Sequence, residues 1–536
     1  MKHHINFLFL LVLFSFTSGS AQSWAWAKGA GGIGSDAANA VTIDEHGNIY
    51  VTGNIAGIAN FSGVGAQGRG IFDVFITKYD PQGNVIWVKL AGGDDNDAGT
   101  AIKYKGGFLY ITGYFNDTAW FETTMLLSRG DADAFVAKYT IDGNLVWVRQ
   151  IGGSNSEVSM SVDADNSGNV YIGGSYEYNM MLDTFHLSTT NLYNESFIAK
   201  YNSAGNVVWA KSGRGNNANQ ITGVAFDNDH SVFVTGYFGG NFKIDAGNTN
   251  SATTSSDIFL AKIDANGNYD WLKRAGSTYE DAAHGVCSDA NGNAILVGYF
   301  GGTAYFDSHT VTYSDYSDVF VARYDSMGNN LWVRAGRGHQ QDLGWGVTVD
   351  ASGNIFATGM YRDIIDFDGY ILNAYDYDIF LVSYSPAGNI RWSTTAGGVN
   401  TDCGFSVAVS NAGMLVMAGY YSYTGYYGNI HIDNAIVNDI VVAAYNPPAV
   451  NSVGQVEDDL KVSLSPNPIS ASTDCLLQIS KEEKYQVKIF SISGQLLWEE
   501  LNPQNNRIKT AELPTGIYLI EVTSISINKI LRLVKQ

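Results

Sequence analysis

Cysteine and proline are scarce in this chain, with three cysteines and eight prolines among 536 residues. The three cysteines, Cys287, Cys403 and Cys475, are too few and too scattered for a disulfide framework, so the fold must depend on packing. Basic residues are also in the minority: 31 Lys and Arg stand against 52 Asp and Glu, a formal net charge of −21. This charge argues against nucleic acid and anionic membrane surfaces as partners, because both bind basic patches.

Long hydrophobic runs are missing after the first residues. Residues 1–21 combine a basic start at Lys2, an apolar run at 7–16 and small residues at Gly19-Ser20-Ala21, which is typical of a secretory signal peptide. The apolar run is too short to span a membrane, and we expect no transmembrane segment in the mature chain. No cysteine follows the cleavage site, which argues against a lipid anchor.

Motifs of catalysis are rare as well. The histidines show no metal-ligand spacing, and we find no Gly-x-Ser-x-Gly, phosphate loop or zinc motif. Residues 63–68 match Gly-x-Gly-x-x-Gly, but a predicted strand at 74–79 follows where a dinucleotide site needs a helix. We interpret this stretch as a loop. The sequence therefore does not decide whether the chain is an enzyme, and it favours a non-enzyme without a cofactor.

A repeat of about sixty residues dominates the chain instead. Seven tryptophans lie 61, 60, 62, 62, 61 and 60 residues apart: Trp26, Trp87, Trp147, Trp209, Trp271, Trp332 and Trp392. A glycine and an acidic residue recur with the same period: Gly53, Gly113, Gly174, Gly236, Gly298, Gly359 and Gly419, and Asp73, Asp133, Glu195, Asp257, Asp318, Asp378 and Asp439. Fixed periods of this kind are the signature of repeat architectures.

Each unit contains four short runs rich in β-branched and aromatic residues. In the first unit they are 40–44, 49–53, 74–79 and 85–90, separated by turns such as Glu45-His46-Gly47-Asn48. Four antiparallel strands per repeat predict a β-propeller blade. The seventh unit ends at Asn446-Pro447-Pro448 without its fourth strand, whereas residues 23–31 form a fourth strand without a unit. We therefore predict an all-β fold: a seven-bladed β-propeller closed by the N-terminal strand and followed by a small C-terminal β-sandwich.

The expected organisation has four parts. Residues 1–21 are a signal peptide, 22–446 the propeller, 447–457 a linker and 458–536 a C-terminal domain of about seven short strands. In this last part lysine and glutamate become more frequent and aromatic residues become rarer.

The units resemble a bacterial β-propeller repeat family over about four-fifths of the chain. The resemblance is carried by Asp44-Glu45-His46-Gly47-Asn48-Ile49-Tyr50-Val51-Thr52-Gly53, Asp73-Val74-Phe75-Ile76-Thr77-Lys78-Tyr79-Asp80 and Gly83-Asn84-Val85-Ile86-Trp87. It is specific for the fold and says little about function.

Residues 458–536 resemble the type A sorting domain of the type IX secretion system. The motif residues are Pro466, Asn467, Pro468, Gly494, Gly516, Tyr518 and Lys535. The resemblance implies a Bacteroidota-type cell and recognition by the type IX secretion machinery. It also implies passage through the periplasm to the outer cell surface or the extracellular space, often with removal of the domain.

An acidic position precedes the first strand of most units: Asp36, Asp97, Glu157, Asp281, Asp342 and Asp402, with Asn219 in the fourth unit. A ring of such oxygens could bind calcium, which takes six to eight oxygen ligands. The favoured interpretation is a structural one, in which each side chain accepts backbone N–H groups at a repeated turn. Asn219 fits that interpretation because it keeps an acceptor without the charge.

The seventh unit has thirteen residues between Gly419 and Ile432 where other units have eight, which predicts a five-residue insertion within 420–428. Exposed tyrosines can form contacts at low entropic cost. The candidate ligand-binding residues are Tyr423, Tyr426 and Tyr427. The sequence thus predicts a secreted or cell-surface scaffold for binding or adhesion, with a glycan or protein ligand. The alternative is a secreted polysaccharide hydrolase or lyase on a propeller scaffold.

Overall fold

The computed structural model describes residues 23–227, 231–244, 247–251, 255–313, 315–447, 462–465, 474–479, 484–491, 495–501, 503, 506–523 and 528–535. The predicted signal peptide, the linker beyond Pro447, and the motif residues Pro466, Asn467, Pro468 and Gly494 lie outside these ranges. The chain divides into two compact units, Met1–Ala449 and Val450–Gln536.

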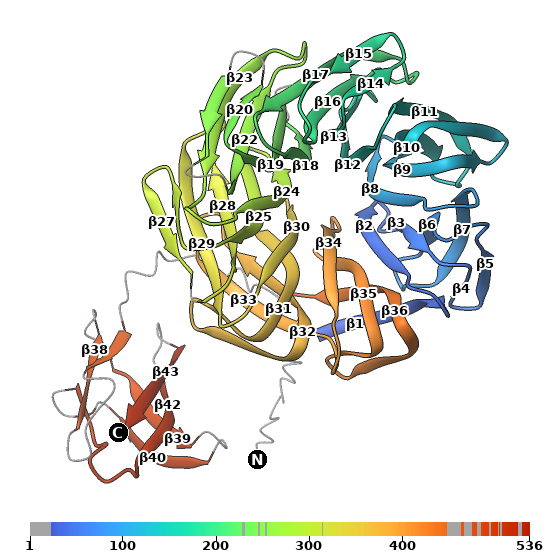
Figure 1. The fold of residues 1–536 in the computed structure, drawn as a ribbon. Coiled ribbons are helices and arrows are strands. Elements are labelled where there is room, and N and C mark those ends of the chain that lie inside the picture. Colours follow the sequence, from blue (N-terminus) through green and yellow to red (C-terminus); the bar gives the residue numbers. More distant parts are fainter. Residues whose placement is uncertain are drawn as a thin grey trace, which may run out of the picture. The chain divides into compact units, whose positions relative to one another are not determined.

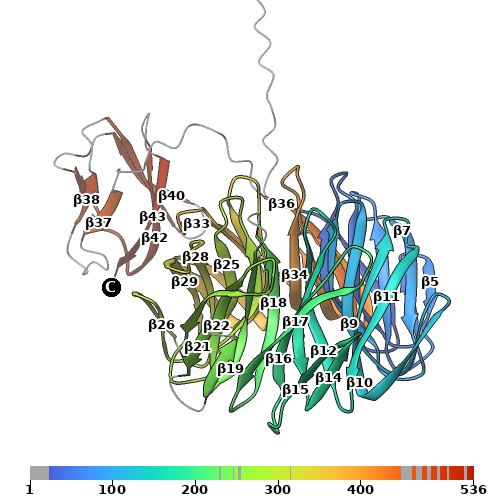
Figure 2. The same ribbon diagram turned by 90° about the horizontal axis from the view of Figure 1, so that it is seen from above.

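Within the described residues of the first unit, antiparallel pairing defines seven groups of four strands (Figures 1 and 2). The first group is β2 (Ala37–Ile43), β3 (Ile49–Ile55), β6 (Asp73–Tyr79) and β7 (Val85–Gly92). The second is β8 (Ala98–Lys105), β9 (Phe108–Phe121), β10 (Thr124–Thr140) and β11 (Leu145–Gly153). The third is β12 (Glu157–Ala164), β13 (Val170–Tyr176), β16 (Glu195–Tyr201) and β17 (Val207–Gly215).

The remaining four groups repeat this order. The fourth is β18 (Asn219–Phe226), β19 (Val232–Gly239), β22 (Ser256–Ile263) and β23 (Tyr269–Ala275). The fifth is β24 (Ala282–Ser288), β25 (Ala294–Phe300), β28 (Asp318–Tyr324) and β29 (Asn330–Gly338). The sixth is β30 (Leu343–Val349), β31 (Ile355–Phe367), β32 (Tyr370–Tyr384) and β33 (Ile390–Ala396). The seventh is β34 (Cys403–Val409), β35 (Leu415–Tyr427), β36 (Ile430–Asn446) and β1 (Ser23–Gly32).

The N-terminal strand β1 supplies the fourth strand of the seventh group. Trp26 to Ala30 pair antiparallel with Ala444 to Ile440 of β36. The pairing joins strands that are more than 400 residues apart in the sequence, and it gives β36 a partner on its outer side. Figure 1 shows the seven groups around one axis, with the first strand of each group, from β2 to β34, nearest the centre.

A second hairpin in each unit reaches back to the preceding group. In three units it is separate from the main strands: β4 (Ile58–Phe61) with β5 (Val64–Gln67), β14 (Asn179–Leu182) with β15 (Phe185–Ser188), and β20 (Asn241–Ile244) with β21 (Gly247–Asn250). These hairpins pair with β1, β11 and β17. The hairpin β26 (Thr303–Phe306) and β27 (His309–Thr312) touches Gly276 through one bridge. In the second, sixth and seventh units the hairpin is the far end of β9/β10, β31/β32 and β35/β36.

The core of the first unit lies between neighbouring groups. One buried cluster combines Val416 and Val442 of the seventh group with Val51 and Phe75 of the first. The repeated tryptophans pack at these interfaces, and in Trp26, Trp147, Trp209, Trp271 and Trp332 the Nε1 atom donates to a turn in the next group. Trp209 Nε1 donates to the carbonyl oxygen of Ala265 at 3.1 Å.

Trp209→Ala is expected to destabilise the first unit by about 3–5 kcal/mol, the usual cost of truncating a buried tryptophan. Trp209 is 6% exposed, and a Cβ on Gly267 of the facing turn would lie 2.8 Å from its ring. The two surfaces are therefore in full contact, and a cavity would remain after truncation. The check is the denaturant midpoint of the tryptophan variant beside that of the wild type. A midpoint equal to that of the wild type would show that the Trp209 side chain does not stabilise the contact between neighbouring blades.

The described part of the second unit contains two sheets. One holds β37 (Val462–Ser465), β38 (Cys475–Ile479) and β41 (Arg507–Ile508). The other holds β40 (Leu496–Leu501), β39 (Gln486–Ser491), β42 (Gly516–Thr523) and β43 (Asn528–Lys535). Leu477 of the first sheet and Val487, Ile520 and Leu533 of the second belong to one buried cluster. The two sheets therefore share a core.

Candidate functional site

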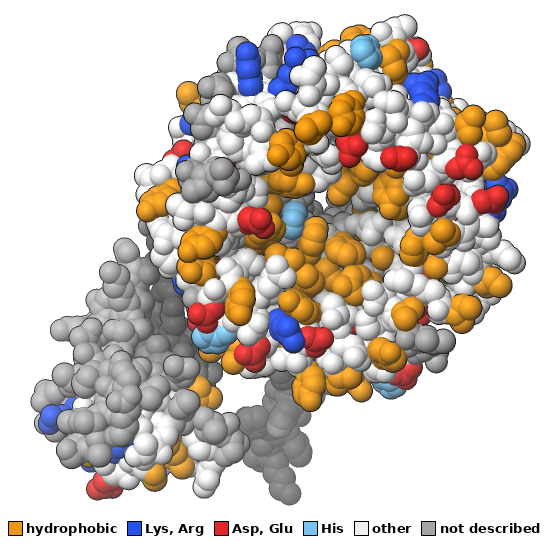
Figure 3. Space-filling model, in the orientation of Figure 1, with side chains coloured by type: hydrophobic (Ala, Val, Ile, Leu, Met, Phe, Trp, Pro, Cys, Tyr) orange, Lys and Arg blue, Asp and Glu red, His pale blue; other side chains and the backbone are white. Residues whose placement is uncertain are grey.

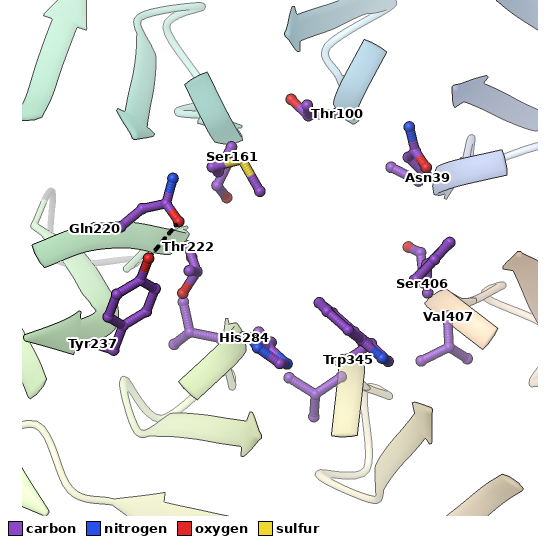
Figure 4. A pocket seen from close by; sticks show the side chains of 18 residues that line it. Asn39, Thr100, Ser161, Gln220, Thr222, Tyr237, His284, Trp345, Ser406 and Val407 are labelled. Carbon is purple, nitrogen blue, oxygen red and sulfur yellow. Dashed lines mark hydrogen bonds between the residues drawn. The ribbon is translucent and has the colours of Figure 1, made fainter. Parts of the chain in front are cut away.

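The first strands of the seven groups surround a central cavity of about 510 Å³ (Figure 4). These strands are neighbours around the axis, and β34 contacts β2. Figure 3 shows hydrophobic side chains gathered around the hollow at the centre of the face drawn. The cavity is therefore enclosed by all seven repeats, so that each repeat can contribute a different side chain to one space.

One position in each inner strand points into this cavity. The pairing of every inner strand with its neighbour skips one residue near its start, for example between Ala38 and Ala40 and between Gly344 and Gly346. A β-bulge of this kind leaves its extra residue outside the ladder and redirects the side chain. The seven bulge residues all line the cavity: Asn39, Thr100, Met160, Thr222, His284, Trp345 and Phe405.

Four bulge residues have a structural role, because their side chains form a hydrogen bond with a backbone carbonyl of the next inner strand. Asn39 Nδ2 donates to Gly99 at 2.9 Å, and Thr100 Oγ1 donates to Ser159 at 2.6 Å. Thr222 Oγ1 donates to Ala283 at 2.7 Å. His284 Nδ1 lies 2.9 Å from the Gly344 oxygen. These bonds tie consecutive repeats together, which explains polar side chains at these positions without any ligand.

The imidazole of His284 is held in one state by its surroundings. Burial lowers its pKa to about 4, although the bond to the Gly344 carbonyl opposes the shift. The ring is therefore neutral at pH 7. Because the carbonyl can only accept, Nδ1 carries the proton and Nε2 is left as an acceptor.

Three aromatic bulge residues follow one another around the axis. The rings of His284 and Trp345 are stacked, with centroids 3.9 Å apart and planes 8° apart. Phe405 meets Trp345 edge-on at 5.5 Å. Trp345 Nε1 is buried without a hydrogen-bond partner among the described residues. Figure 4 shows His284 and Trp345 on one side of the space, with Asn39 and Thr100 across from them.

The described lining of the cavity carries no Asp, Glu, Lys or Arg side chain. Its polar groups are amides and hydroxyls, among them Gln220, Ser161 and Tyr237. Tyr237 and His284 also line a second pocket of about 410 Å³, together with Asn217, Glu280 and Tyr299. The central cavity thus continues outward between the fourth and fifth groups.

The predicted acidic positions are fully buried, and each faces backbone N–H groups. Asp97 accepts from Gly93 at 2.7 Å and from Asn116 at 3.1 Å, and Asp402 accepts from Gly398 and Ser422 in the same way. The same two contacts hold Asp36 and Asp281. Asp342 accepts from Arg362 alone, since the Gly338 N–H donates to Asp318, and Glu157 accepts from Gly153. Among the described residues no group of three or more His, Cys, Asp or Glu side chains is placed to hold a metal ion. The contacts agree with the structural interpretation of this ring; the calcium hypothesis stays a prediction.

Each of these carboxyls has a second carboxyl nearby, which the sequence analysis did not foresee. The partner is the acidic residue that opens the third strand, as in Asp97 with Asp73 and Asp402 with Asp378. Burial raises the pKa of Asp97 to about 7 and that of Asp378 to about 8, and the neighbouring carboxylate adds to both shifts. In the fourth repeat the pair is Asn219 and Glu195, and the Asn219 amide donates to Glu195 at 2.7 Å. An amide occupies the place where a protonated carboxyl would donate.

The predicted insertion in the seventh repeat is wrong. The hairpin turn joins Tyr427 to Ile430, and Tyr427 lies eight residues after Gly419, as Phe61 does after Gly53. Tyr427 is fully buried and packs edge-on against Trp24 at 5.3 Å, so it is a core residue of this hairpin. Tyr423 and Tyr426 are 54% and 55% exposed, and for them ligand contact stays a prediction.

Sequence reasoning missed the bulge ring, although a signal was present. The third residue after each acidic position varies in type from Asn to Trp, while the residues around it repeat. Of the sorting motif, the described residues place Gly516 at the start of β42, Tyr518 within it, and Lys535 at the end of β43. Lys535 is buried, and its Nζ donates to Thr510 and Ala511 at 2.6 and 2.7 Å.

The fold and the family comparisons define a β-propeller repeat protein that is exported. Residues 463–536 match the family described as a secretion system C-terminal sorting domain, and residues 146–175 match the family described as a β-propeller repeat. Both resemblances found in the sequence are confirmed, and the sorting domain indicates delivery to the outer surface or the extracellular space. In the described residues no helix is long and apolar enough to cross a membrane.

Two curated proteins are similar to the chain. The uncharacterized WD repeat-containing protein L264 of Acanthamoeba polyphaga mimivirus is 23% identical over 458 residues, which cover 69% of this chain and 33% of that protein. Regulatory protein FlaEY of Caulobacter vibrioides is 25% identical over 253 residues, which cover 43% of this chain and 26% of that protein. The chain thus spans a third or less of the length of these relatives.

Two solved structures are also similar. Sqt1 from Chaetomium thermophilum has a TM-score of 0.39 at 9% identity, covering 74% of this chain and 83% of that one. Puromycin hydrolase has a TM-score of 0.38 at 12% identity, covering 75% and 55%. At these scores neither structure bears on function.

Proposed function

We propose that this protein is a seven-bladed β-propeller, closed by its N-terminal strand, that acts outside the cell as a binding or adhesion scaffold. Its ligand is an extracellular glycan or protein, and the type IX secretion machinery is its partner during export. The pairing of β1 with β36 and the contact of β34 with β2 support closure. The sorting domain supports the location.

The observation that carries the binding role is the break in symmetry at the bulge positions. A purely structural position has the same role in every repeat. The four polar bulge residues have such a role, because each bonds to the next inner strand. Trp345 and Phe405 make no such bond among the described contacts, yet they place aromatic rings in the central cavity. Aromatic side chains in a concave site with a few polar groups are typical of ligand binding.

The cavity favours binding over the alternative, a polysaccharide hydrolase. Glycoside hydrolysis generally uses two carboxyl groups on either side of the scissile bond. The described lining offers none, and the buried carboxyl pairs of the blades lie against backbone N–H groups. The neutral His284 is fixed by its bond to Gly344 as well.

The test compares retention of the purified full chain on cell envelopes and on extracellular polymer. Trp345→Ala is expected to reduce retention about tenfold, because interface anchors of this kind carry most of a binding energy. Tyr305→Ala removes an aromatic that is 57% exposed on an outer hairpin, and it should bind as the wild type does. Unchanged retention of the Trp345 variant would refute the cavity as the binding site, and shortening of the polymer would instead favour the enzyme.

A further inference from the structure

We propose that the central cavity binds one end of an uncharged glycan chain, with the aromatic wall His284, Trp345 and Phe405 as its platform. This inference rests on the proposed binding function and names its ligand.

The available groups lie in one sector. On the side of Asn39, Thr100 and Thr222 the side-chain donors already bond to neighbouring strands. On the other side, the neutral His284 carries an unprotonated Nε2 that can accept a hydrogen bond, whereas Trp345 Nε1 is buried and out of a ligand's reach. Trp345 and Phe405 add aromatic surface beside this acceptor.

These groups suit a sugar ring. A sugar has an apolar C–H face that packs on aromatic rings, and an edge of hydroxyls that both donate and accept hydrogen bonds. The described lining contains amides, hydroxyls and aromatic rings and no charged side chain. A charged ligand in this cavity would be buried without a counter-ion, which is costly.

The charge of the whole protein further narrows the class of glycan that the cavity is expected to bind. The chain carries a formal net charge of −21 and a pI near 4.7. Such a field lowers the local concentration of uronic or sulfated polysaccharides. Among glycans the neutral ones are therefore favoured.

The shape of the space indicates how the chain enters. Seven inner strands surround the cavity, so a polymer cannot lie flat across it, whereas a chain end can enter along the axis. A further pocket of about 340 Å³ adjoins the cavity and is lined by the same inner strands, including the ion pair of Lys103 and Asp163. The second pocket shares Tyr237 and His284 with the cavity and adds Tyr299 and Asn217. Units behind the chain end can follow this pocket outward between β18 and β24.

The experiment measures calorimetric binding of the full chain to linear neutral oligosaccharides of increasing length. Cyclic oligosaccharides of the same units have no end and serve as the matched ligand control, and acidic oligosaccharides form the third set. We expect binding of at least one linear neutral series, with affinity that stops rising after a few units, and no binding of its cyclic form. Binding of acidic or cyclic ligands alone would overturn the inference.

Substitutions at the bulge positions test where in the cavity the oligosaccharide binds. Trp345→Ala and Phe405→Ala should each weaken binding about tenfold or more, because both remove aromatic anchors. Met160→Ala removes a bulge residue that is outside the aromatic wall, and it should change affinity less than about threefold. Trp345→Phe keeps an aromatic ring but a smaller one, so it should weaken binding measurably even if the alanine variant is unstable. Thermal melting of each variant checks folding.

The outcomes separate this inference from the proposed function. If no saccharide binds, but Trp345→Ala still abolishes a protease-sensitive retention on cell envelopes, the ligand is a protein and only the inference fails. If retention is also independent of Trp345 and Phe405, both fail.

Discussion

Deletion of residues 23–32 is expected to lower the free energy of unfolding of the propeller unit by at least about 5 kcal/mol, or to prevent its folding. β1 places Trp24, at 8% exposure, against Tyr427 and Tyr445 with ring centroids 5.3 and 5.2 Å away. Loss of a buried tryptophan alone costs about 3–5 kcal/mol. The deletion also leaves backbone groups of β36 and of β4 unpaired.

Two milder variants keep this prediction testable if the deletion does not fold. Trp24→Ala should lower the denaturant midpoint as Trp209→Ala does. Gly32→Val should lower it too, because a Cβ at residue 32 would lie 1.9 Å from the carbonyl oxygen of Ile58. A deletion variant that unfolds at the same denaturant concentration as the full chain would show that β1 does not close the ring.

The free energy of unfolding is expected to fall as the pH rises from about 4 to about 8. Burial, reinforced by Asp36, raises the pKa of Asp439 to about 7, and burial raises the pKa of Asp281 to about 7 and that of Glu157 to about 8. The ordinary values are 3.8 for Asp and 4.5 for Glu. Between the ordinary and the raised pKa values, the folded state therefore holds protons that the unfolded chain has released. The stabilising contribution of these carboxyls is full below about pH 4 and is lost as the pH rises through their raised pKa values.

One extra proton across three pH units corresponds to about 4 kcal/mol, and we expect a loss of at least this size. Below pH 4 an opposite effect sets in, because hydrogen bonds from Asn48 and neighbouring N–H groups lower the pKa of Asp44. Its stabilising contribution disappears as the pH falls through that lowered pKa. The measurement is a series of denaturant titrations from pH 3 to pH 9, in which maximal stability should lie near pH 4–5.

Two substitutions with opposite effects test the cause. Asp378 Oδ1 is buried without a hydrogen-bond partner among the described residues, so Asp378→Asn places a permanent donor beside Asp402 and should stabilise the protein at pH 8. Asn219→Asp creates an additional acid pair with Glu195 and should destabilise at pH 8 with little effect at pH 4. If calcium at pH 8 restored the stability seen at pH 4, the pairs would be cation sites instead of proton-sharing pairs.

The sequence repeat predicted the main strands closely. The four runs expected in the first repeat, 40–44, 49–53, 74–79 and 85–90, correspond to β2, β3, β6 and β7 within a few residues at each end. These strands are uniform because every blade packs on the next through the same surface, so their pattern repeats in sequence. The second hairpins were not predicted, because β4 and β5 have only four residues each and pair with the preceding repeat.

The site could not be predicted in the same way. Strict alternation along β2 does not indicate where Asn39 points, because the bulge after Ala38 shifts the alternation by one residue. The seventh repeat misled for another reason. Tyr427 stands where four other hairpins have phenylalanine, so the count from Gly419 was carried on to Ile432 and gave five residues too many. His284, Trp345 and Phe405 lie side by side only because the blades are arranged around one axis, which brings together residues about sixty positions apart in the sequence.

The most direct test of the account is hydrogen exchange of the full chain with and without a saturating extracellular ligand, read at the inner strands. The account predicts protection within β24, β30 and β34, around His284, Trp345 and Phe405, and none in the same experiment with Trp345→Ala. Protection confined to the outer hairpins near Tyr305 or Tyr426, with the inner strands unchanged, would contradict a binding site in the central cavity.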